Sequence, residues 1–335
     1  MQFDQLKRRE FTTLLGSAAA WPLAARAQQP ERVRLIGVLM GYPESAPEGQ
    51  TFIAAFRDGF HKLGWTEGRN TRIDTRWAAP NDAESMQRFA KELVALQPDV
   101  ILSHSTPTTA ALLQQTRTIP VVFAHVSDPV GSGFVTSFPR PGGNATGFDV
   151  SEPAQAGKWV ELLREIAPRV TRAAMLYNPI SAAYAEFWLS PFKAATASVS
   201  MDAIAAPVRD RSDLESVFAT QARETNSGLI AMPDSFLIAH RVEITSLAVR
   251  FGLPTVYPYR LFAEVGGLLS YGSELADNFR RAAVYVDRIL KGEKPSELPV
   301  QAPVKFQLVV NRKTATSMGL TIPTSLLVAA EELID

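Results

Sequence analysis

The chain has 335 residues, 46% of them hydrophobic, which is enough for more than one domain with a packed core. Its 34 basic and 34 acidic residues balance, which excludes the strong basic field that binding to nucleic acid or anionic lipid requires. With four histidines and no cysteine, the sequence excludes thiolate metal clusters, disulfides and cysteine nucleophiles, and we expect no cofactor.

The first 27 residues have the pattern of an export signal. Arg8 and Arg9 precede a weakly apolar stretch from Phe11 to Leu23, which is shorter than the roughly 20 strongly apolar residues of a membrane span. The sequence Ala25-Arg26-Ala27 then matches a signal-peptidase site. Paired arginines favour the Tat route, which exports folded proteins. We therefore expect cleavage after Ala27 and a soluble periplasmic protein.

From residue 33 onward, short apolar runs alternate with helical patterns. Strands are expected at Val33–Leu39, Ile73–Trp77, Asp99–Leu102 and Pro120–Ala124, and helices at Thr51–Leu63, Glu84–Leu96 and Thr108–Gln115. In the first helix, Phe52, Phe56, Phe60 and Leu63 form one apolar stripe. This order predicts a parallel sheet with helices on both faces.

The alternation stops at the turn-rich segment Pro139–Asn144 and then restarts. Helices are expected at Gln155–Ala167, Ala182–Val199, Ser212–Glu224, Phe236–Phe251, Glu274–Leu290 and, after Pro323, Thr324–Ile334. Strands are expected at Ala173–Tyr177, Asp202–Ala206, Gly228–Met232, Thr255–Tyr257, Gly267–Tyr271 and Phe306–Val310. The sequence thus predicts an α/β fold of two Rossmann-like lobes, each of about 120 residues, with a tail that crosses between them.

Ligands of open parallel sheets bind beyond the carboxyl ends of the strands, where helix N-termini present free N–H groups. Several predicted strand ends carry suitable polar or aromatic residues. These candidates are Tyr42, Ser105, Thr106, His125, Asp128, Asn178, Asp234, Tyr257 and Tyr259.

Some of these residues also fit purely structural roles. Ser105 and Thr106 suit either a helix cap or a ligand carboxylate. Asp234 suits either an N-cap or the counter-charge of a ligand ammonium group. Tyr257 and Tyr259 suit either the core or an apolar wall with polar tips.

Five motifs occur in order along the chain: Leu63–Asn70, Ser127–Gly133, Arg140–Gly147, Ile289–Pro295 and Met318–Pro323. Through them the chain resembles the ABC-transporter substrate-binding proteins related to the tryptophan-binding lipoprotein of gram-positive bacteria. The resemblance covers essentially the whole mature chain. It implies a type I periplasmic-binding fold, in which two lobes with parallel sheets are joined by a three-stranded hinge.

The resemblance also implies where the lobes and the cleft lie. Crossings are expected near Gly147, near Leu268–Gly272 and near Pro299–Pro303. The N-terminal lobe would then comprise residues 28–147 plus 272–300, and the C-terminal lobe residues 148–271 plus 301–335. Thr106 and Pro107, His125 to Asp128, Asn178 and Asp234 match positions that line the cleft. The signal lacks the lipobox cysteine of the tryptophan-binding branch, which favours a soluble form.

The expected function is the periplasmic solute-binding component of an ABC importer, with an inner-membrane permease as partner. Amino acids and aromatic or carboxylic acids are the leading ligands. Ser105 and Thr106 would hold a carboxylate, Asp234 an amino group, and the three candidate tyrosines the body of the ligand. We expect a monomer that is neither an enzyme nor a nucleic-acid binder.

The alternative that stays open is an exported sensor, which would present a bound solute to a signalling receptor. A hydrolase is disfavoured because no G-x-S-x-G, H-E-x-x-H or P-loop pattern occurs. A DNA-binding regulator with the same lobes would need an N-terminal helix-turn-helix, and this chain carries an export pattern there.

Overall fold

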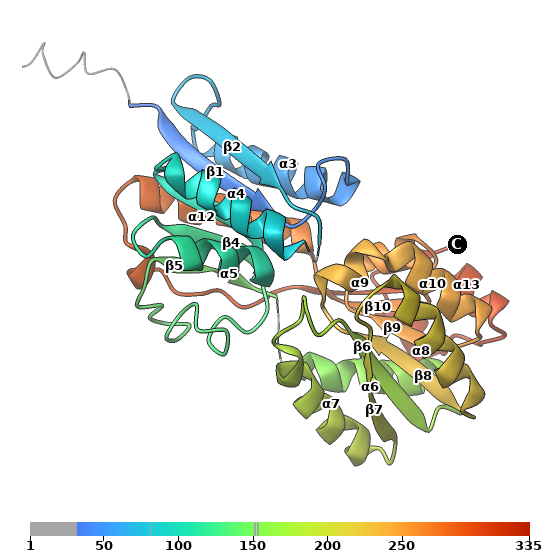
Figure 1. Ribbon diagram of the computed structural model, residues 1–335. Coiled ribbons are helices and arrows are strands. Elements are labelled where there is room, and N and C mark those ends of the chain that lie inside the picture. The colour runs from blue at the N-terminus through green and yellow to red at the C-terminus, as the bar shows by residue number, and fades with distance from the viewer. Residues whose placement is uncertain (1–31, 81, 151, 153) are drawn as a thin grey trace, which may run out of the picture.

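The computed structural model describes residues 32–80, 82–150, 152 and 154–335. These residues form two α/β lobes, each built on its own sheet (Figure 1). The export signal predicted for residues 1–27 lies outside the described residues. Within the described part of the chain, no helix is long and apolar enough to cross a membrane.

The N-terminal lobe contains a five-stranded parallel sheet in the order β2–β1–β3–β4–β5. Its strands are β1 (Arg34–Met40), β2 (Thr71–Trp77), β3 (Val100–Ser105), β4 (Val121–Val126) and β5 (Ala145–Asp149). Every residue of β3, β4 and β5 is buried, as in parallel sheets that helices cover on both faces. The strand β5 was not predicted, because threonine, glycine and aspartate interrupt its apolar pattern.

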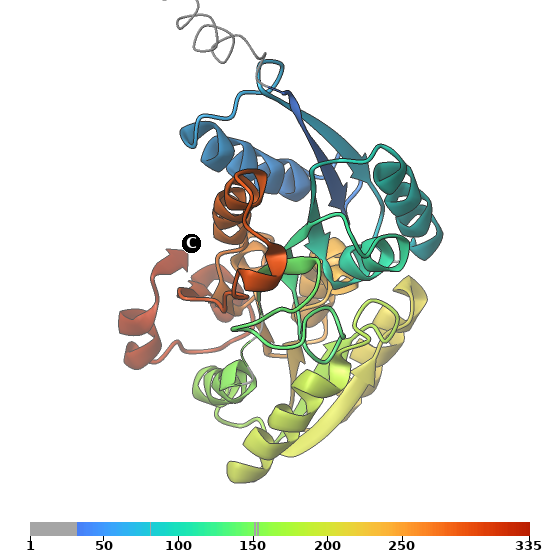
Figure 2. The same ribbon diagram turned by 90° about the vertical axis from the view of Figure 1, so that its left-hand side faces the viewer.

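One face of this sheet is covered by α3 (Pro47–Lys62) and α12 (Leu275–Leu290), and the other by α4 (Ala83–Ala95) and α5 (Thr106–Gln115). Although far apart in sequence, α3 and α12 pack side by side (Figure 2). Phe52 of α3 stacks on Phe279 of α12, with ring centroids 5.0 Å apart. The predicted stripe is buried except for Leu63, which is 37% exposed because the helix ends at Lys62.

The C-terminal lobe contains a seven-stranded sheet in the order β12–β11–β10–β9–β8–β6–β7. Its strands are β6 (Arg172–Tyr177), β7 (Asp202–Pro207), β8 (Ser227–Ala231), β9 (Thr255–Tyr257), β10 (Leu269–Ser273), β11 (Phe306–Asn311) and β12 (Glu332–Ile334). All neighbours are parallel except β10 and β11, which are antiparallel.

The helices of this lobe lie on both faces of its sheet. They are α6 (Ala154–Ile166), α7 (Ala185–Ser198), α8 (Arg211–Arg223), α9 (Ser235–Ala239), α10 (Arg241–Arg250), α11 (Arg260–Glu264), α13 (Arg312–Ser317) and α14 (Thr324–Ala329). A short 3₁₀ turn at Pro295–Glu297 packs against β5 of the N-terminal lobe instead. Alternate residues of β6 face two different cores: Ala173 and Met175 face α6 and α7, whereas Ala174 and Leu176 face α8 to α10.

Two helix predictions for this lobe are wrong. The helix predicted at Phe236–Phe251 is two helices, α9 and α10, because the backbone leaves the helical region at His240 with φ −100° and ψ 16°. The helix predicted at Thr324–Ile334 ends at Ala329, and the chain then forms β12. The free edge of β11 explains this ending, since β12 pairs in parallel with that edge. The short helices α11 and α13 were not predicted.

Three segments connect the lobes, after β5, after β10 and before β11. The first and third segments pair with each other, since the Asp149 N–H donates to the Gln301 carbonyl and the Gln301 N–H donates to the Gly147 carbonyl, both at 2.9 Å. Gly147 has a φ of +151°, and a Cβ added there would lie 2.0 Å from the Phe123 carbonyl oxygen. Only glycine fits this position beside the central sheet.

The lobes are in direct contact along the hinge side. A single cluster of buried apolar residues runs through both of them, from Tyr42 and Phe52 in the N-terminal lobe to Phe236 and Tyr259 in the C-terminal lobe. At this seam the carboxyl ends of β3 and β4 face the carboxyl end of β8 in the other lobe. The cleft predicted from the sequence lies at the same place.

Candidate ligand-binding site

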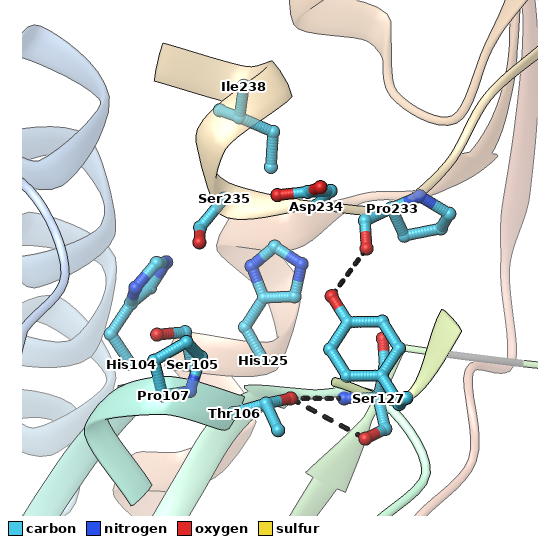
Figure 3. A pocket seen from close by; sticks show the side chains of 11 residues that line it. His104, Ser105, Thr106, Pro107, His125, Ser127, Pro233, Asp234, Ser235 and Ile238 are labelled. Atoms are coloured by element: carbon cyan, nitrogen blue, oxygen red, sulfur yellow. Dashed lines mark hydrogen bonds between the residues drawn. The ribbon is translucent and has the colours of Figure 1, made fainter. Parts of the chain in front are cut away.

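A cavity of about 10 Å³ lies between the lobes, at the carboxyl ends of their strands (Figure 3). The N-terminal lobe lines it with residues at the ends of β3 and β4, and the C-terminal lobe with residues around the start of α9 and with Tyr184, which precedes α7. The lining residues are His104, Ser105, Thr106, Pro107, His125 and Ser127 from the first lobe, and Tyr184, Pro233, Asp234, Ser235 and Ile238 from the second. This volume holds about one water molecule, so a larger ligand requires the two walls to separate.

Two imidazoles form the N-terminal wall of the cavity. The rings of His104 on β3 and His125 on β4 lie edge to face, with centroids 5.3 Å apart. His104 also packs against Tyr42, Phe52 and Phe279, with ring centroids 4.8 to 6.0 Å away. Neither ring nitrogen of His104 has a hydrogen-bond partner among the described residues, and the same holds for Nδ1 of His125.

Both imidazoles are neutral at neutral pH. Burial lowers the pKa of His125 to about 3. Burial, and then the proximity of His125, hold the pKa of His104 well below its usual value.

A hydrogen bond joins the lobes through this wall. Nε2 of His125 lies 3.0 Å from the hydroxyl of Tyr259, and the two residues are 8% and 2% exposed. Tyr259 precedes α11 in the C-terminal lobe. The distance depends on how closely the lobes approach each other, so this bond is a contact of the closed arrangement.

Ser105 and Thr106 line the cavity where α5 begins. The Ser105 N–H donates to Oγ1 of Thr108 at 2.8 Å. Oγ1 of Thr106 accepts a hydrogen bond from the Ser127 N–H at 3.0 Å, which fixes the end of β3 to the end of β4. The Thr106 hydroxyl thus ties two strand ends together and caps no helix, and its side chain still borders the cavity.

Asp234 is the N-cap of α9 and is 1% exposed. Its carboxylate accepts hydrogen bonds from the Phe236 N–H at 2.8 Å, the Asn178 N–H at 2.6 Å and the Ser181 hydroxyl at 2.5 Å. Burial nevertheless raises its pKa to about 6, because three bonds only partly replace hydration. The Asp234 carboxylate therefore caps α9 and also borders the cavity.

Five predicted residues do not line the cavity. Tyr42 lies behind His104, and Tyr259 lies behind His125. Oδ1 of Asp128 accepts from the Gly131 N–H at 2.8 Å within a turn. Asn178 holds the loop after β6, where its Oδ1 accepts from the N–H groups of Ile180 and Ser181. Tyr257 stacks on Phe262 in the core.

Five lining residues were missing from the predicted site and from the positions that the resemblance implied: His104, Tyr184, Pro233, Ser235 and Ile238. His104, Pro233 and Ser235 directly adjoin predicted residues at the same strand ends, so their position in the sequence could have pointed to them. Tyr184 lies seven residues after the end of β6, where nothing in the sequence marks it. Its hydroxyl donates to the Pro233 carbonyl at 2.6 Å, and burial followed by the charge of Asp234 raises its pKa.

An ion pair also bridges the lobes. Glu48 of α3 contacts Arg241 of α10, and their side chains are 19% and 15% exposed. An ion pair with so little exposure is weakly screened by salt. It adds a charged contact to the closed arrangement.

A family model described as ABC transporter substrate binding protein matches residues 45–334. Among solved structures, an ABC domain from Streptococcus pneumonia in complex with L-Trp is 26% identical, with a TM-score of 0.82 over 90% of this chain and 100% of that chain. A conserved domain protein from Vibrio cholerae is 28% identical, with a TM-score of 0.83 and the same coverage.

A curated relative, a tyrosine-binding protein from Clostridioides difficile (strain R20291), is 22% identical over 85% of this chain and 80% of its own length. Together with the two sheets described above, these similarities confirm the predicted family resemblance and the type I periplasmic-binding fold.

Proposed function

Because the chain belongs to the ABC transporter substrate binding protein family, we propose that it captures a small molecule between its lobes and delivers it to an ABC permease in the inner membrane. One observation carries the proposal. Residues that line the cavity from both lobes carry buried polar atoms without hydrogen-bond partners within the described chain, namely the ring nitrogens of His104, Nδ1 of His125 and the Ser235 hydroxyl. Buried polar atoms in proteins are almost always hydrogen-bonded, and a captured solute would supply the partners.

The ligand in this proposal is an amino acid or another small carboxylic acid. The tyrosine-binding relative and the neighbour in complex with L-Trp support this class. The side chains support it as well, because Asp234 presents a carboxylate to an ammonium group, while Ser105 at the start of α5 suits a carboxylate.

The cavity lining refines the proposed site. Ser105, Thr106, His125 and Asp234 contact the ligand, and Tyr42 and Tyr259 support the histidines from behind. Asp128, Asn178 and Tyr257 serve the fold of their own lobes.

Calorimetric titration of the full chain, freed of bound solute by unfolding and refolding, tests this proposal. Amino acids, aromatic acids and dicarboxylates are titrated into the wild type and into Asp234→Asn, which keeps a residue able to cap α9. Removal of the charge should reduce the binding free energy of an amino-acid ligand by about 2–5 kcal/mol. Asp128→Asn is the matched control and should leave the affinity unchanged. Absence of binding by every class would remove the proposed function.

We propose further that residues 1–27 direct export by the Tat route and that the mature protein is a periplasmic monomer. The proposal rests on Arg8, Arg9 and the Ala25-Arg26-Ala27 site. Mass spectrometry of the exported protein should find Gln28 at the N-terminus, and light scattering should give the mass of one chain. A start far from Gln28 would contradict the cleavage site.

The proposed lobe boundaries remain residues 28–147 plus 272–300 and residues 148–271 plus 301–335. The positions of the connecting segments support them, because each boundary falls in or beside one of these segments. Hydrogen exchange tests the boundaries, since a ligand that closes the lobes should slow exchange at the seam and the hinge and leave the outer helices unchanged.

A further inference from the structure

The cavity offers a ligand very little formal charge. Within the described chain, no lysine or arginine lines it. Its carboxylate, Asp234, already accepts three hydrogen bonds from its own lobe. Its two imidazoles are buried and neutral. An ionic group deep in this cavity would therefore lose its hydration without gaining a counter-charge at the histidine wall.

The unpartnered polar atoms of this wall form a specific pattern. A neutral imidazole carries one N–H donor and one acceptor nitrogen. Neither nitrogen of His104 has a partner within the described chain, so in either tautomer one is a free donor and the other a free acceptor. Nδ1 lies on the Gly41 side of the ring, 3.0 Å from where a Cβ on Gly41 would stand, which leaves Nε2 for a ligand. Nδ1 of His125 adds one more site, and the Ser235 hydroxyl points toward the two rings from the opposite lobe (Figure 3). A group that both donates and accepts hydrogen bonds matches this arrangement.

The surroundings of the pair are aromatic rather than ionic. Tyr42, Phe52 and Phe279 surround the His104 ring, and Tyr259 lies edge-on to His125. Such surroundings strengthen hydrogen bonds to neutral groups and disfavour buried charges.

We propose that His104 and His125 recognise an uncharged hydrogen-bonding group at the buried end of the ligand, such as a hydroxyl, an amide or a ring N–H. The site then selects amino acids with polar, uncharged side chains over their apolar or charged counterparts. This selectivity rests on the proposed function, because it takes the cavity between the lobes as the ligand site.

Matched ligand pairs test the selectivity by calorimetric titration of the full chain. Tyrosine differs from phenylalanine by one hydroxyl, and glutamine differs from glutamate by charge. The uncharged polar member of each pair should bind about 10- to 100-fold more tightly, because the other member leaves buried nitrogens unpaired or buries a charge. Equal affinities within both pairs would overturn the selectivity and leave the proposed function intact.

His104→Phe links the selectivity to the wall, because phenylalanine keeps a ring against Phe52 and Phe279 but has no ring nitrogen. This variant should lose the preference for tyrosine while its affinity for phenylalanine stays the same or rises. His61→Phe, at an exposed position of α3, should change neither affinity. Urea unfolding shows whether His104→Phe is folded, and a folded variant that keeps the full preference would overturn the assignment.

A panel of neutral sugars and amides separates the two proposals. If these bind in a His104-dependent manner and no amino acid binds, the selectivity stands and the amino-acid function falls. If nothing in either panel binds, both proposals are overturned.

Discussion

Tyr259→Phe removes a single oxygen atom, and with it the hydrogen bond that joins the C-terminal lobe to His125. In the closed arrangement, Nε2 of this imidazole would then be buried without a partner. In an open arrangement water would hydrate it, so the change acts on the closed form alone.

The structure sets the size of this effect. The bond is 3.0 Å long, and both residues are at least nine-tenths buried. Leaving one buried polar atom unsatisfied costs about 1–3 kcal/mol, which corresponds to a 5- to 150-fold shift from the closed to the open form. Ligand affinity should fall by the same factor, because the ligand is held only when the lobes close.

Tyr257 provides the matched control two residues earlier. It is fully buried, and its ring stacks on Phe262 within its own lobe. Tyr257→Phe should therefore leave ligand affinity unchanged. Fluorescence transfer between a dye on α4 and a dye on α8 reports lobe closure, and calorimetry reports affinity. Equal behaviour of the two variants in both assays would refute the assignment of the Tyr259 bond to the closed form.

Three further predictions concern the seam, the hinge and the histidine wall. Glu48→Gln should lower ligand affinity several-fold in calorimetry by removing a poorly screened ion pair between the lobes, whereas Lys62→Gln in the exposed pair on α3 should not; equal losses would contradict this. Gly147→Ala should unfold in urea far earlier than Gly143→Ala, because a Cβ at Gly147 clashes with backbone and one at Gly143 meets nothing within 4 Å; matching midpoints would contradict this. Because burial lowers the pKa of His125 to about 3, its contribution to stability is present above pH 6.5 and shrinks as the pH falls. Between pH 7 and pH 5, the free energy of unfolding from urea titrations should thus fall by about 2 kcal/mol more for the wild type than for His125→Gln. An equal fall in both proteins would contradict this.

The alternating elements of the fold were predictable because burial leaves a strong local pattern. Phe52, Phe56 and Phe60 recur at helical spacing on α3, and a helix was predicted there. The strand β12 was not predictable, because its apolar residues also fit a helix and its pairing depends on the free edge of β11, about 25 residues earlier in the chain. The break at His240 is likewise decided by tertiary packing, and no proline or glycine marks it.

The location of the site followed from topology, whereas the roles of its side chains did not. Ser105, Thr106, His125 and Asp234 border the cavity because parallel strands end at the same edge of a sheet. The sequence shows that Asp234 precedes a helix, but the two donors from the loop after β6 are visible only in three dimensions. Tyr184 likewise borders the cavity through a contact between distant parts of the chain, its hydrogen bond to the Pro233 carbonyl.

The placement of α12 has a consequence for synthesis. This helix completes the N-terminal lobe by packing on α3, yet the chain encodes it after five of the seven strands of the C-terminal sheet. A growing chain therefore cannot finish its first lobe until residue 290 has left the ribosome. Until then, Phe52 of α3 lacks its stacking partner Phe279, so the N-terminal lobe is completed only after most of the C-terminal lobe has been synthesised.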